Sequence, residues 1–521
     1  MRSLLALFVM VVPVFAACSP TDDRVCTAES TDLEVDPLNC GSCGNICGQG
    51  YSCVGFACVE GACQPGAVEE CYSAPMETLG VGPCVAGMRT CDEAATWSRC
   101  TDVHPVQEIC NDGIDNDCNG MPDDDVDADG DGVTSCAGDC CDNSGICSKP
   151  ELVNPGAFDA AGNNFDDDCN GTIDDTLLFC DQGLVSNSSD ALDFARAIDI
   201  CQQTTDTGPS WGVISAAFTL ADGTGAPDPE GRAIRPSFGS GALPQGGVNL
   251  VILSTGGAAA RDDLNPGYHD WVSYTHTGGN SSPSPADFLG ANNGKLPNAP
   301  GCPAATSTVA NDPVMLTLRI RVPTNARSFK LSSNFYSAEF PEFTCNRFND
   351  FFVVLLDSTY AGTPANPTDK NLAFYQRPGS TNKVPVGVNL GFGNTGLFTQ
   401  CVNGATGCGA GSVRGNITTC RGTQQLAGTG FDDPAAGSCG AGSVKGGATG
   451  WLVTSGNVTS GEIITLRIAI WDTSDHRFDS LSLIDGFQWS TELAQPGTVV
   501  FSESPNLPPP AQQLIGNVLR Q

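Results

Sequence analysis

Aspartate and asparagine side chains recur at alternate positions in three short segments between Glu108 and Asp175, a spacing that suits a divalent cation. This stretch holds 19 Asp and Glu residues and a single basic residue, Lys149. Carboxylates at this density repel one another unless a cation lies among them, and their hard oxygens suit Ca²⁺ or Mg²⁺. A glycine in each segment permits the sharp turn that lets the side chains face one ion. The predicted ligands are Asp115, Asp117, Asn119 and Asp123 around Gly120; Asp125, Asp127, Asp129 and Asp131 around Gly130; and Asp166, Asp168, Asn170 and Asp174 around Gly171.

The spacing excludes an EF-hand. An EF-hand loop requires a bidentate glutamate at position 12. Counted from the first aspartate of each segment, that position holds Val126, Cys136 or Leu177. The segments are therefore predicted to be calcium loops of another kind, with Cys118 and Cys169 as covalent staples. Turns that hold no metal are the alternative.

The charge balance of the chain excludes two classes of partner. The formal net charge is −35 over 521 residues, so nucleic acids and anionic membrane surfaces would be repelled. A chain of this length can form several domains with cores of their own. Outside the Asp-rich segments, the acidic side chains are interpreted as a solubilising surface. We expect contact with a membrane only through a covalent lipid.

The N-terminus predicts export. Met1–Ala17 combines Arg2 with an apolar run too short to span a bilayer comfortably, which is typical of a signal peptide. The run ends in FAAC and resembles a bacterial lipoprotein cleavage box, although Phe15 stands where that box usually has leucine. The resemblance implies that Cys18 becomes the lipid-bearing first residue of the exported chain. With Ser19 beside it, we expect anchoring at the outer membrane or cell surface.

Cysteine usage agrees with export. The chain has 27 cysteines, and setting Cys18 aside leaves an even number that could pair completely as disulfides. Such bonds persist in oxidising compartments. Residues 18–100 are rich in cysteine and glycine and poor in apolar clusters, so we expect small modules held by disulfides. A zinc site at Cys40, Cys43 and Cys47 is the alternative, which the small number of histidines disfavours.

A resemblance to a known repeat becomes specific in residues 64–180. The residues that carry it read ETLGVGPCVAGMRTCDEAATWSRCTDVHPVQEICNDGIDNDCNG, followed by the acidic spacer DADGDGVTSCAGDCCDNSGICSKP. This sequence resembles the metal-binding repeats of MopE-type proteins. The second repeat departs from the pattern because Ala161 occupies the place of Cys110. Its Cys169 must therefore pair elsewhere, with Cys180 as the candidate partner.

The MopE-type resemblance carries an association with copper, whereas the ligand types in the acidic repeats (residues 101–181) favour calcium. Copper prefers imidazole, thiolate and thioether ligands, and oxygen-rich loops suit Ca²⁺. The chain has four histidines and six methionines, and no histidine lies inside the Asp-rich segments. Ca²⁺ is therefore the expected cofactor. Copper binding and turns without metal are the alternatives.

Beyond Asp181 the composition changes and predicts a second architecture. Many apolar runs alternate with period two, and turn-rich segments separate them. The runs are WGVISAAFTL, VNLVILST, VMLTLRIRV, SFKLSSNFYSAEF, FFVVLLD, IITLRIAIWD and DSLSLIDGFQW. The chain is thus predicted to be mainly β, with an antiparallel β-sandwich or jelly-roll-like domain over 183–492, preceded by small disulfide-rich, Asp-rich repeat modules. A Pro-rich flexible tail is expected over 493–521, and a short amphipathic helix at Ser189–Cys201, capped by Ser189 or Asp190.

The predicted β domain resembles the bacterial choice-of-anchor L domain. The residues that carry the resemblance are WGVISAAFTL, NLVILSTGGA, FYSAEFPEFTCNRFNDFFVVLL and IAIWDTSDHRFDSLSLIDGF. That family occurs on exported surface proteins with varied anchoring devices, and its motif defines no activity. The anchor implied here is the N-terminal lipid. Two related segments, GCGAGSVRG (407–415) and SCGAGSVKG (438–446), are interpreted as surface loops tied by a disulfide.

The motifs of the β domain carry a second candidate metal site. Its polar residues lie at the ends of apolar strands, so their loops could meet at one edge of the sandwich. Converging carboxylates and an amide would favour Ca²⁺. The alternative is a set of caps and turns that make local backbone hydrogen bonds. The candidates are Glu339, Glu342, Asn349, Asp350, Asp472, Asp475 and Asp479.

Support for catalysis is thin. Glu339 and Glu342 could act as the carboxylate pair of a glycosidase, but nothing in the sequence fixes their separation. Metalloprotease, α/β-hydrolase and P-loop motifs are absent from the sequence. Tyr268 and His269 near Trp271 could stack on a sugar, with local packing as the alternative.

These observations predict an exported, lipid-anchored surface protein that is not an enzyme. Calcium would convert the self-repelling acidic repeats into an ordered spacer. The β-sandwich head would present a binding or adhesion face to another cell, a matrix polymer or a protein, an expectation that rests partly on family analogy. A copper-sequestering surface protein is the first alternative, and an enzyme acting on surface polysaccharide is the second.

Overall fold

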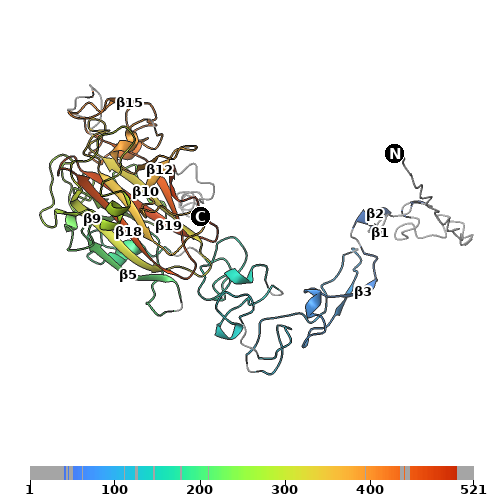
Figure 1. Cartoon of the computed structure of the whole chain (residues 1–521). Helices are drawn as coiled ribbons and strands as arrows, with labels where there is room; N and C mark the ends of the chain where they lie inside the picture. The colour runs from blue at the N-terminus through green and yellow to red at the C-terminus, as the bar shows by residue number, and fades with distance from the viewer. Residues whose placement is uncertain are drawn as a thin grey trace, which may run out of the picture. The chain divides into compact units, whose positions relative to one another are not determined.

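A computed structural model describes most of the chain between residues 40 and 500. The described residues are 40, 42, 45, 51–54, 56–60, 63–94, 96–110, 112–123, 127–144, 147–175, 179–208, 210–393, 395–434, 439 and 446–500. The predicted signal peptide, the lipid site at Cys18 and the tail beyond Val500 lie outside them. The chain divides into two compact units, Met1–Asp124 and Asp125–Gln521, which are described separately (Figure 1).

The first unit consists of small hairpins held by disulfides. Strands β1 (Tyr51–Val54) and β2 (Ala57–Glu60) pair antiparallel, as do β3 (Val68–Cys71) and β4 (Gly87–Thr90). A single 3₁₀ turn, η1 (Met76–Thr78), is present among the described residues of this unit. Two-stranded hairpins bury little apolar surface and are marginal alone, so cross-links must contribute much of the stability.

The second unit contains an antiparallel β-sandwich. In the larger sheet the strand order is β20 (Gly497–Val500), β17 (Leu452–Asn457), β10 (Ser328–Ser337), β19 (Ser480–Ser490), β7 (Leu250–Ser254) and β6 (Arg232–Arg235), with β16 (Gly447–Ala448) also on β10. In the smaller sheet the order is β11 (Phe351–Asp357), β18 (Ile463–Thr473), β9 (Val309–Arg321) and β5 (Gly212–Thr219), with β8 (Ser281–Pro283) also on β9. The mainly β prediction is confirmed.

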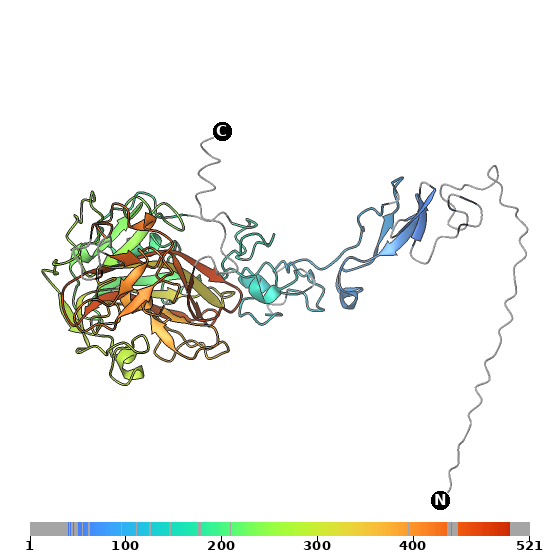
Figure 2. The ribbon, with the colours of Figure 1, turned by 90° about the horizontal axis from the view of Figure 1, so that it is seen from above.

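Shorter elements complete the second unit. Two hairpins, β12 (Phe374–Gln376) with β13 (Lys383–Pro385) and β14 (Gly404–Thr406) with β15 (Gly415–Ile417), lie outside the two sheets. The helices are α1 (Ala191–Arg196) and α2 (Ala286–Ala291), and the 3₁₀ turns are η2 (Ser135–Ala137), η3 (Pro150–Leu152), η4 (Pro229–Gly231), η5 (Val388–Gly391) and η6 (Gln424–Leu426). In both views the strands gather in the C-terminal part of the chain, and the acidic repeats are mostly loop (Figures 1 and 2).

The main core lies between the two sheets, and alternate residues of the central strands fill it. Leu316 and Leu318 of β9 belong to the same buried cluster as Ile468 of β18 and Phe329 of β10. The intervening residues face the other side of the smaller sheet, where Met315 packs in a separate cluster with the aromatic side chains of α2 and β18. The first part of β9 is therefore buried on both faces, whereas buried and partly exposed residues alternate from Leu316 to Arg321.

The structure gives the disulfide pairing, which the sequence left open except for one suggested pair. The described pairs are Cys40–Cys53, Cys63–Cys91, Cys71–Cys100, Cys84–Cys118, Cys140–Cys169, Cys141–Cys147, Cys180–Cys201, Cys302–Cys345, Cys401–Cys420 and Cys408–Cys439. The last pair joins the two duplicated loops, as predicted. The suggested Cys169–Cys180 pair is wrong, because Cys169 meets Cys140 of the spacer, and Cys180 meets Cys201 just beyond α1.

Two boundary predictions can be compared with the structure. The predicted helix forms as α1, and the Asp190 side chain caps it by accepting the Leu192 N–H. Residues assigned to a flexible tail include β20, which pairs with β17, so the sheet continues to Val500. Among the described residues, no helix has both the length and the apolar composition needed to cross a bilayer.

Candidate metal-binding loops

The first acidic loop folds around the side chain of Asp115. Its two oxygens accept the N–H groups of Asn119 and Gly120, each at 3.0 Å, and Asp117 accepts the Asn119 N–H at 3.0 Å. Gly120 has φ +100°, a left-handed conformation that glycine adopts without steric cost. Cys118 ties the loop to Cys84. The local sequence therefore forms a tight turn with the carboxylates on its inner side.

Glu108, which precedes the predicted motif, holds the same loop together by hydrogen bonds. Its side chain accepts the N–H groups of Asn116, Asp117 and Asp123 at 2.9, 3.1 and 3.1 Å, and Glu108 is 4 % exposed. One oxygen each from Glu108, Asp115 and Asp117 lie within 4.8 Å of one another. Asp112 forms a second such group with Glu108 and Asp123. Sequence reasoning missed Glu108 and Asp112 as ligands because they precede the alternating pattern.

The second acidic loop repeats the hydrogen bonds of the first. Asp166 accepts the N–H groups of Asn170 and Gly171 at 3.0 and 2.8 Å, and Asp168 accepts the Asn170 N–H at 3.2 Å. The backbone angles also agree, with Gly171 at φ +92°. Asp174 accepts N–H groups from the start of the loop, as Asp123 does in the first repeat. One folding pattern thus serves both repeats.

The two repeats differ in how closely their carboxylates converge. Among the described residues, the groups of three acidic side chains with oxygens within 4.8 Å lie between Glu108 and Asp142, and the second loop contributes none. In that loop the shorter Asp159 stands at the position of Glu108, and Asn163 stands at the position of Asp112. The shorter side chain and the lost carboxylate account for the wider spacing. The first loop is therefore the better preformed cation site.

The middle loop uses a different set of residues from the one predicted. Asp127 accepts the N–H groups of Gly130 and Gly132 at 2.7 and 2.9 Å, so Gly132 corresponds to Gly120 of the first loop. The motif therefore begins at Asp127, two positions later than the sequence suggested, and Asp125 lies outside the described residues. Oxygens of Asp127, Asp129 and Asp142 form one close group, and those of Asp129, Asp131 and Asp139 form another. Asp139 and Asp142 were not predicted, because they follow the motif at a distance that no alternating pattern marks.

Burial and mutual repulsion favour protons on the middle loop when no metal is bound. Burial, followed by repulsion from neighbouring carboxylates, raises the pKa of Asp139 to about 7 and that of Asp129 to about 6, although a backbone hydrogen bond to each opposes the rise. Burial also raises the pKa of Asp131. The metal-free folded chain holds protons here that the unfolded chain has released, so its stability falls as the pH rises from about 4 to about 7.

We predict that Ca²⁺ binding by the middle loop strengthens between about pH 5.5 and about pH 8. The cation must displace the protons on Asp129 and Asp139 at the lower pH and meets ionised carboxylates at the higher pH. Calorimetric titration of the full chain in two buffers with different ionisation enthalpies measures both the affinity and the protons released. An affinity that does not change with pH, with no proton release, would contradict the assignment.

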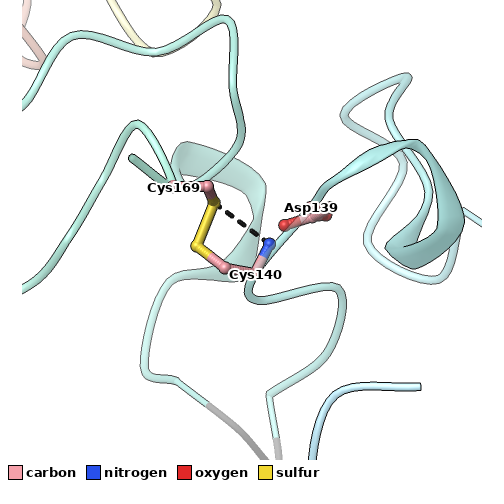
Figure 3. A group of neighbouring side chains, drawn as sticks. All are labelled: Asp139, Cys140 and Cys169. Carbon is pink, nitrogen blue, oxygen red and sulfur yellow. Dashed lines mark hydrogen bonds between the residues drawn. A yellow bond between two sulfur atoms is a disulfide. The ribbon is translucent and has the colours of Figure 1, made fainter. Parts of the chain in front are cut away.

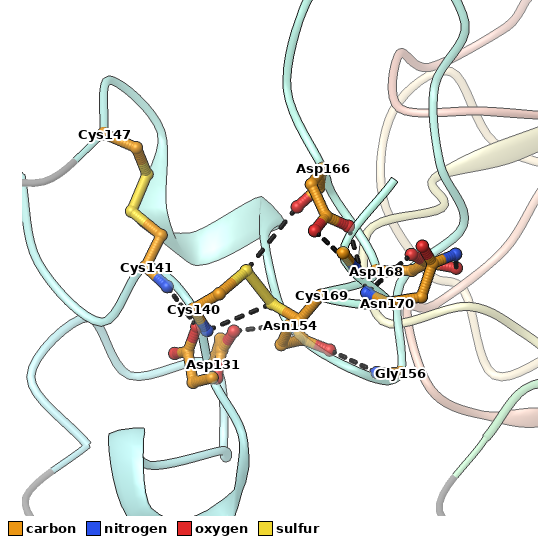
Figure 4. Close-up of a disulfide and its surroundings, with 12 residues drawn as sticks. Asp131, Cys140, Cys141, Cys147, Asn154, Gly156, Asp166, Asp168, Cys169 and Asn170 are labelled. Carbon is orange, nitrogen blue, oxygen red and sulfur yellow. Dashed lines mark hydrogen bonds between the residues drawn. A yellow bond between two sulfur atoms is a disulfide. The ribbon is translucent and has the colours of Figure 1, made fainter. Parts of the chain in front are cut away.

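Asn154 connects the middle loop to the β-sandwich. Its amide donates to the Asp131 carboxylate at 2.6 Å, and its oxygen accepts the Gly156 N–H and the Thr324 hydroxyl at 2.9 and 2.6 Å (Figure 4). The side chain is fully buried. Thr324 lies between β9 and β10, so one side chain joins an acidic loop to the sandwich. The middle loop and the head are therefore parts of one folded unit.

Replacing Asn154 with alanine should loosen the 127–175 segment. The change leaves the Asp131 oxygen, the Gly156 N–H and the Thr324 hydroxyl without their partner, and a buried group left unsatisfied costs about 1–3 kcal/mol. Hydrogen exchange of the full chain should show faster exchange in this segment than in β9 and β18. The control N187A removes an exposed asparagine and should change stability by less than about 0.5 kcal/mol. Equal exchange in N154A and the wild type would be the contrary result.

Two cysteines near the middle loop do not offer thiolate ligands. Asp139, Cys140 and Cys169 lie within 4.8 Å, but the two sulfurs form a disulfide, and the Cys140 N–H points to the Cys169 sulfur at 3.0 Å (Figure 3). A disulfide sulfur lacks the negative charge that makes a thiolate a strong ligand for soft metals. Oxygen atoms are therefore the main candidate metal ligands around these loops.

The structure brings some of the predicted head residues together and places others elsewhere. Glu339, Asp350, Asp472 and Asp479 are buried near one another at the end of the sandwich where strands of both sheets terminate. Asp475 is half-buried at the edge of this group. Asn349 instead accepts the Asn389 N–H, and Glu342 lies near Cys439, with no member of the group among its electrostatic neighbours.

The aromatic group near His269 packs inside the protein. Trp271 is fully buried, stacks on Phe431 and donates its indole N–H to the Thr429 carbonyl at 2.8 Å. Tyr268 contacts the edge of Trp271, and His269 stacks on Tyr274. The packing interpretation of Tyr268 and Trp271 is therefore supported over a stacking platform for sugar.

The acidic repeats match the model of a known family. The model of a family named Cu-binding MopE, whose description proposes a metal-binding motif, matches residues 101–124 and 150–175. These two matches enclose the first and second acidic loops, while the middle loop and the β-sandwich fall outside them. No curated protein and no solved structure matches the chain. The chain thus carries a MopE-type metal-binding motif twice.

Proposed function

We propose that the acidic repeats bind Ca²⁺ and thereby order the segment that carries the β-sandwich head. The observation that carries the proposal is the first loop, in which oxygens of Glu108, Asp115 and Asp117 lie within 4.8 Å of one another. Like charges so close are unfavourable unless they are neutralised, and a set made of carboxylate oxygens suits calcium. The twofold match to a metal-binding motif supports the same assignment.

The arrangement around the loops explains how an ion would act on structure. The carboxylates are already oriented by backbone N–H groups, so binding requires little rearrangement of the chain. The 127–175 segment contains only two 3₁₀ turns and no strand among its described residues, so few interactions other than disulfides and aspartate hydrogen bonds hold it. An ion that joins carboxylates from separate turns would stabilise this segment by linking binding to folding.

Copper sequestration is the second candidate, and the family name and one histidine favour it. His104 lies inside the first matched segment, and its Nδ1 is 3.8 Å from Asp102. Its side chain is 44 % exposed, and the ligands that copper prefers are otherwise scarce in the loops. Calcium is therefore the better fit to the donor atoms.

Protection from proteolysis tests the proposed role directly. The full chain, with its disulfides formed, would be digested with and without Ca²⁺ after treatment with a chelator. Cleavage within residues 101–175 should slow in Ca²⁺ and should not slow in Mg²⁺ at the same concentration, because Mg²⁺ demands a tighter octahedral shell. Cleavage at the same rate with and without Ca²⁺ would refute an ordering role.

The remaining parts of the proposal concern location and partner. We propose that Cys18 carries a lipid that anchors the chain at the outer membrane or cell surface, and that the head binds a surface, matrix or protein ligand without catalysing a reaction. Support comes from the sequence of the N-terminus and from the resemblance of the head to surface domains. Replacing Cys18 with alanine should release the chain from the membrane fraction, and retention in that fraction would contradict the anchor.

A further inference from the structure

Five buried carboxylates meet where the ends of both sheets of the sandwich come together. Antiparallel pairing places the starts of β9 and β11 beside the end of β18, and places the start of β19 between the end of β10 and the end of β7. The carboxylates lie on or next to these strand ends, and none is more than 2 % exposed. The members are Asp312, Glu339, Asp350, Asp472 and Asp479, named here the head cluster.

Two members of the head cluster have complete hydrogen-bond partners. Asp350 accepts the Thr473 N–H at 3.2 Å and the Ser480 hydroxyl at 2.7 Å, and so links β18 of one sheet to β19 of the other. Asp312 accepts the His276 N–H at 3.0 Å, and its other oxygen lies 2.6 Å from Nδ1 of His476. These contacts fix the positions of the strand ends around the cluster.

The other three members are buried without adequate partners. Neither oxygen of Asp479 makes a hydrogen bond to a described residue, and one oxygen of Glu339 is also unpaired. The Thr255 hydroxyl is the one described side chain close enough to pair with Asp472. The nearby Thr255 hydroxyl is directed at the Ser480 carbonyl at 3.3 Å. Within the described part of the chain, no lysine or arginine nitrogen lies within 4.0 Å of any member. Isolated buried carboxylates are strongly unfavourable, so something must neutralise them.

An unpaired histidine nitrogen supplies an independent sign of a ligand. His276 is 2 % exposed, and its Nε2 lies 3.1 Å from the Gly256 carbonyl, a contact that requires the proton on Nε2. The other ring nitrogen is Nδ1. It is buried, has no hydrogen-bond partner among the described residues, and lies 4.0 Å from an oxygen of Asp312. A buried ring nitrogen without a hydrogen-bond partner is unfavourable in either protonation state, so a further group that pairs with it is expected there.

Protonation alone does not resolve the arrangement. Burial, followed by repulsion from the neighbouring carboxylates, raises the pKa of Glu339 and Asp472 well above the usual range, and burial and repulsion act on Asp479 in the same way. A neutral carboxyl group must still donate its O–H to an acceptor; Asp479 has no hydrogen-bond partner among the described residues, and Asp472 has only the Thr255 hydroxyl beside it. A cation satisfies several of these oxygens at once.

We propose that the head cluster binds a divalent cation of the calcium type, independently of the acidic repeats. Asp472, Asp479 and Glu339 would contribute oxygens, and Asp312 and Asp350 would orient the strand ends around the ion. Among the described residues, no three carboxylates of the head cluster have oxygens within 4.8 Å of one another, so the ion would contact some of them directly and the others through water, as is common for Ca²⁺. The ion would join the two sheets at this end and fix the loops that the head displays there.

Terbium luminescence and native mass spectrometry of the full chain test this site. Trp471 directly precedes Asp472, and the Trp271 carbonyl accepts the Asp479 N–H at 2.8 Å, so excited tryptophan should sensitise Tb³⁺ held there. In a chain whose acidic loops are all disabled by D115N, D117N, D123N, D127N, D129N, D166N and D168N, we expect sensitised emission that Ca²⁺ displaces, and at least one bound Ca²⁺ in the mass spectrum. Ca²⁺ at 100-fold excess over its Kd should raise the unfolding midpoint of the head by roughly 5 °C.

Adding D472N and D479N to that chain should abolish the emission, the bound Ca²⁺ and the Ca²⁺-dependent rise of the midpoint. The matched control D206N makes the same chemical change at an exposed aspartate paired with Arg319 and should leave all three intact. The repeat-disabled chain requires no change in the head, so its bound metal tests the head site even if the variant with D472N and D479N fails to fold. Absence of bound metal in that chain, or emission unchanged by D472N and D479N, would overturn the proposal and leave neutral carboxyl groups as the explanation.

Discussion

Exchanging Asp115 and Asp117 for asparagine should abolish calcium binding at the Glu108–Asp115–Asp117 group of the first acidic loop. The change removes two of the three carboxylates whose oxygens lie within 4.8 Å, and leaves Glu108 as the only charged member of that group. Loss of an outer-shell partner already weakens metal binding by about 10–100-fold, so loss of two direct ligands should exceed that range. Calorimetric titration of the full chain with Ca²⁺ should show one fewer class of sites.

The control for this experiment separates loss of a ligand from loss of a turn. Asp92 also holds a turn with its carboxylate, which accepts the N–H groups of Ala94 and Thr96, each at 2.9 Å, but no close acidic group that includes it is described. D92N should therefore leave calcium binding unchanged. If D92N and the Asp115/Asp117 double variant alter the titration equally, the carboxylates act only as turn formers.

Removing the Cys140–Cys169 disulfide should produce the second largest effect. The bond closes a loop of about 29 residues, for which the loss of chain entropy in the unfolded state predicts roughly 3–4 kcal/mol of stabilisation. The segment has little secondary structure to compensate, so the double serine variant should expose residues 127–175 to protease while the sandwich remains folded. Chemical unfolding followed by hydrogen exchange measures the loss in this segment.

A second disulfide of similar span provides the comparison. Cys408–Cys439 closes a loop of sequence separation 31 but ties two duplicated surface loops of the head. Its double serine variant should lose a comparable amount of chain-entropy stabilisation and leave protection of residues 127–175 unchanged. If both variants expose that segment equally, the Cys140–Cys169 bond has no specific role in the acidic repeats.

The acidic loops could be predicted from the sequence because their ligands lie close together in it. Each loop is a turn whose side chains bond to backbone only a few residues away, so Asp115, Asp117 and Asp166 fall where the spacing placed them. Glu108 and Asp142 could not be predicted, because they reach the loops from separate turns. Their contribution depends on a chain path that no local pattern specifies.

The shifted start of the middle loop has a similar cause. The segment DVDADGDG offers two overlapping alternations, one beginning at Asp125 and one at Asp127. Both place a glycine after three aspartates, and only the backbone bond from Gly132 to Asp127 distinguishes them. The disulfide pairing could not be predicted from the sequence either, since Cys169 is bonded to a cysteine 29 residues before it.

The strands of the head were predictable, and the full membership of the head cluster was not. Apolar runs located β9, β18 and β19 because the hydrophobic effect acts on composition as well as on alternation. The carboxylates that follow or precede such strands could also be named. Asp312 and His276 were not predicted as members of the site. Asp312 lies inside an apolar strand, and His276 lies in a long loop before β8. Their approach to Asp479 depends on how the two sheets pack.

Equilibrium dialysis of the metal-free full chain against Ca²⁺ and Cu²⁺ tests the central claim most directly. The account predicts that the wild-type chain retains Ca²⁺, that substituting Asp115, Asp117, Asp166 and Asp168 with asparagine lowers the amount retained, and that Cu²⁺ does not compete for these sites. Retention of Cu²⁺ at low micromolar concentration, with no Ca²⁺ bound by the repeats, would contradict it.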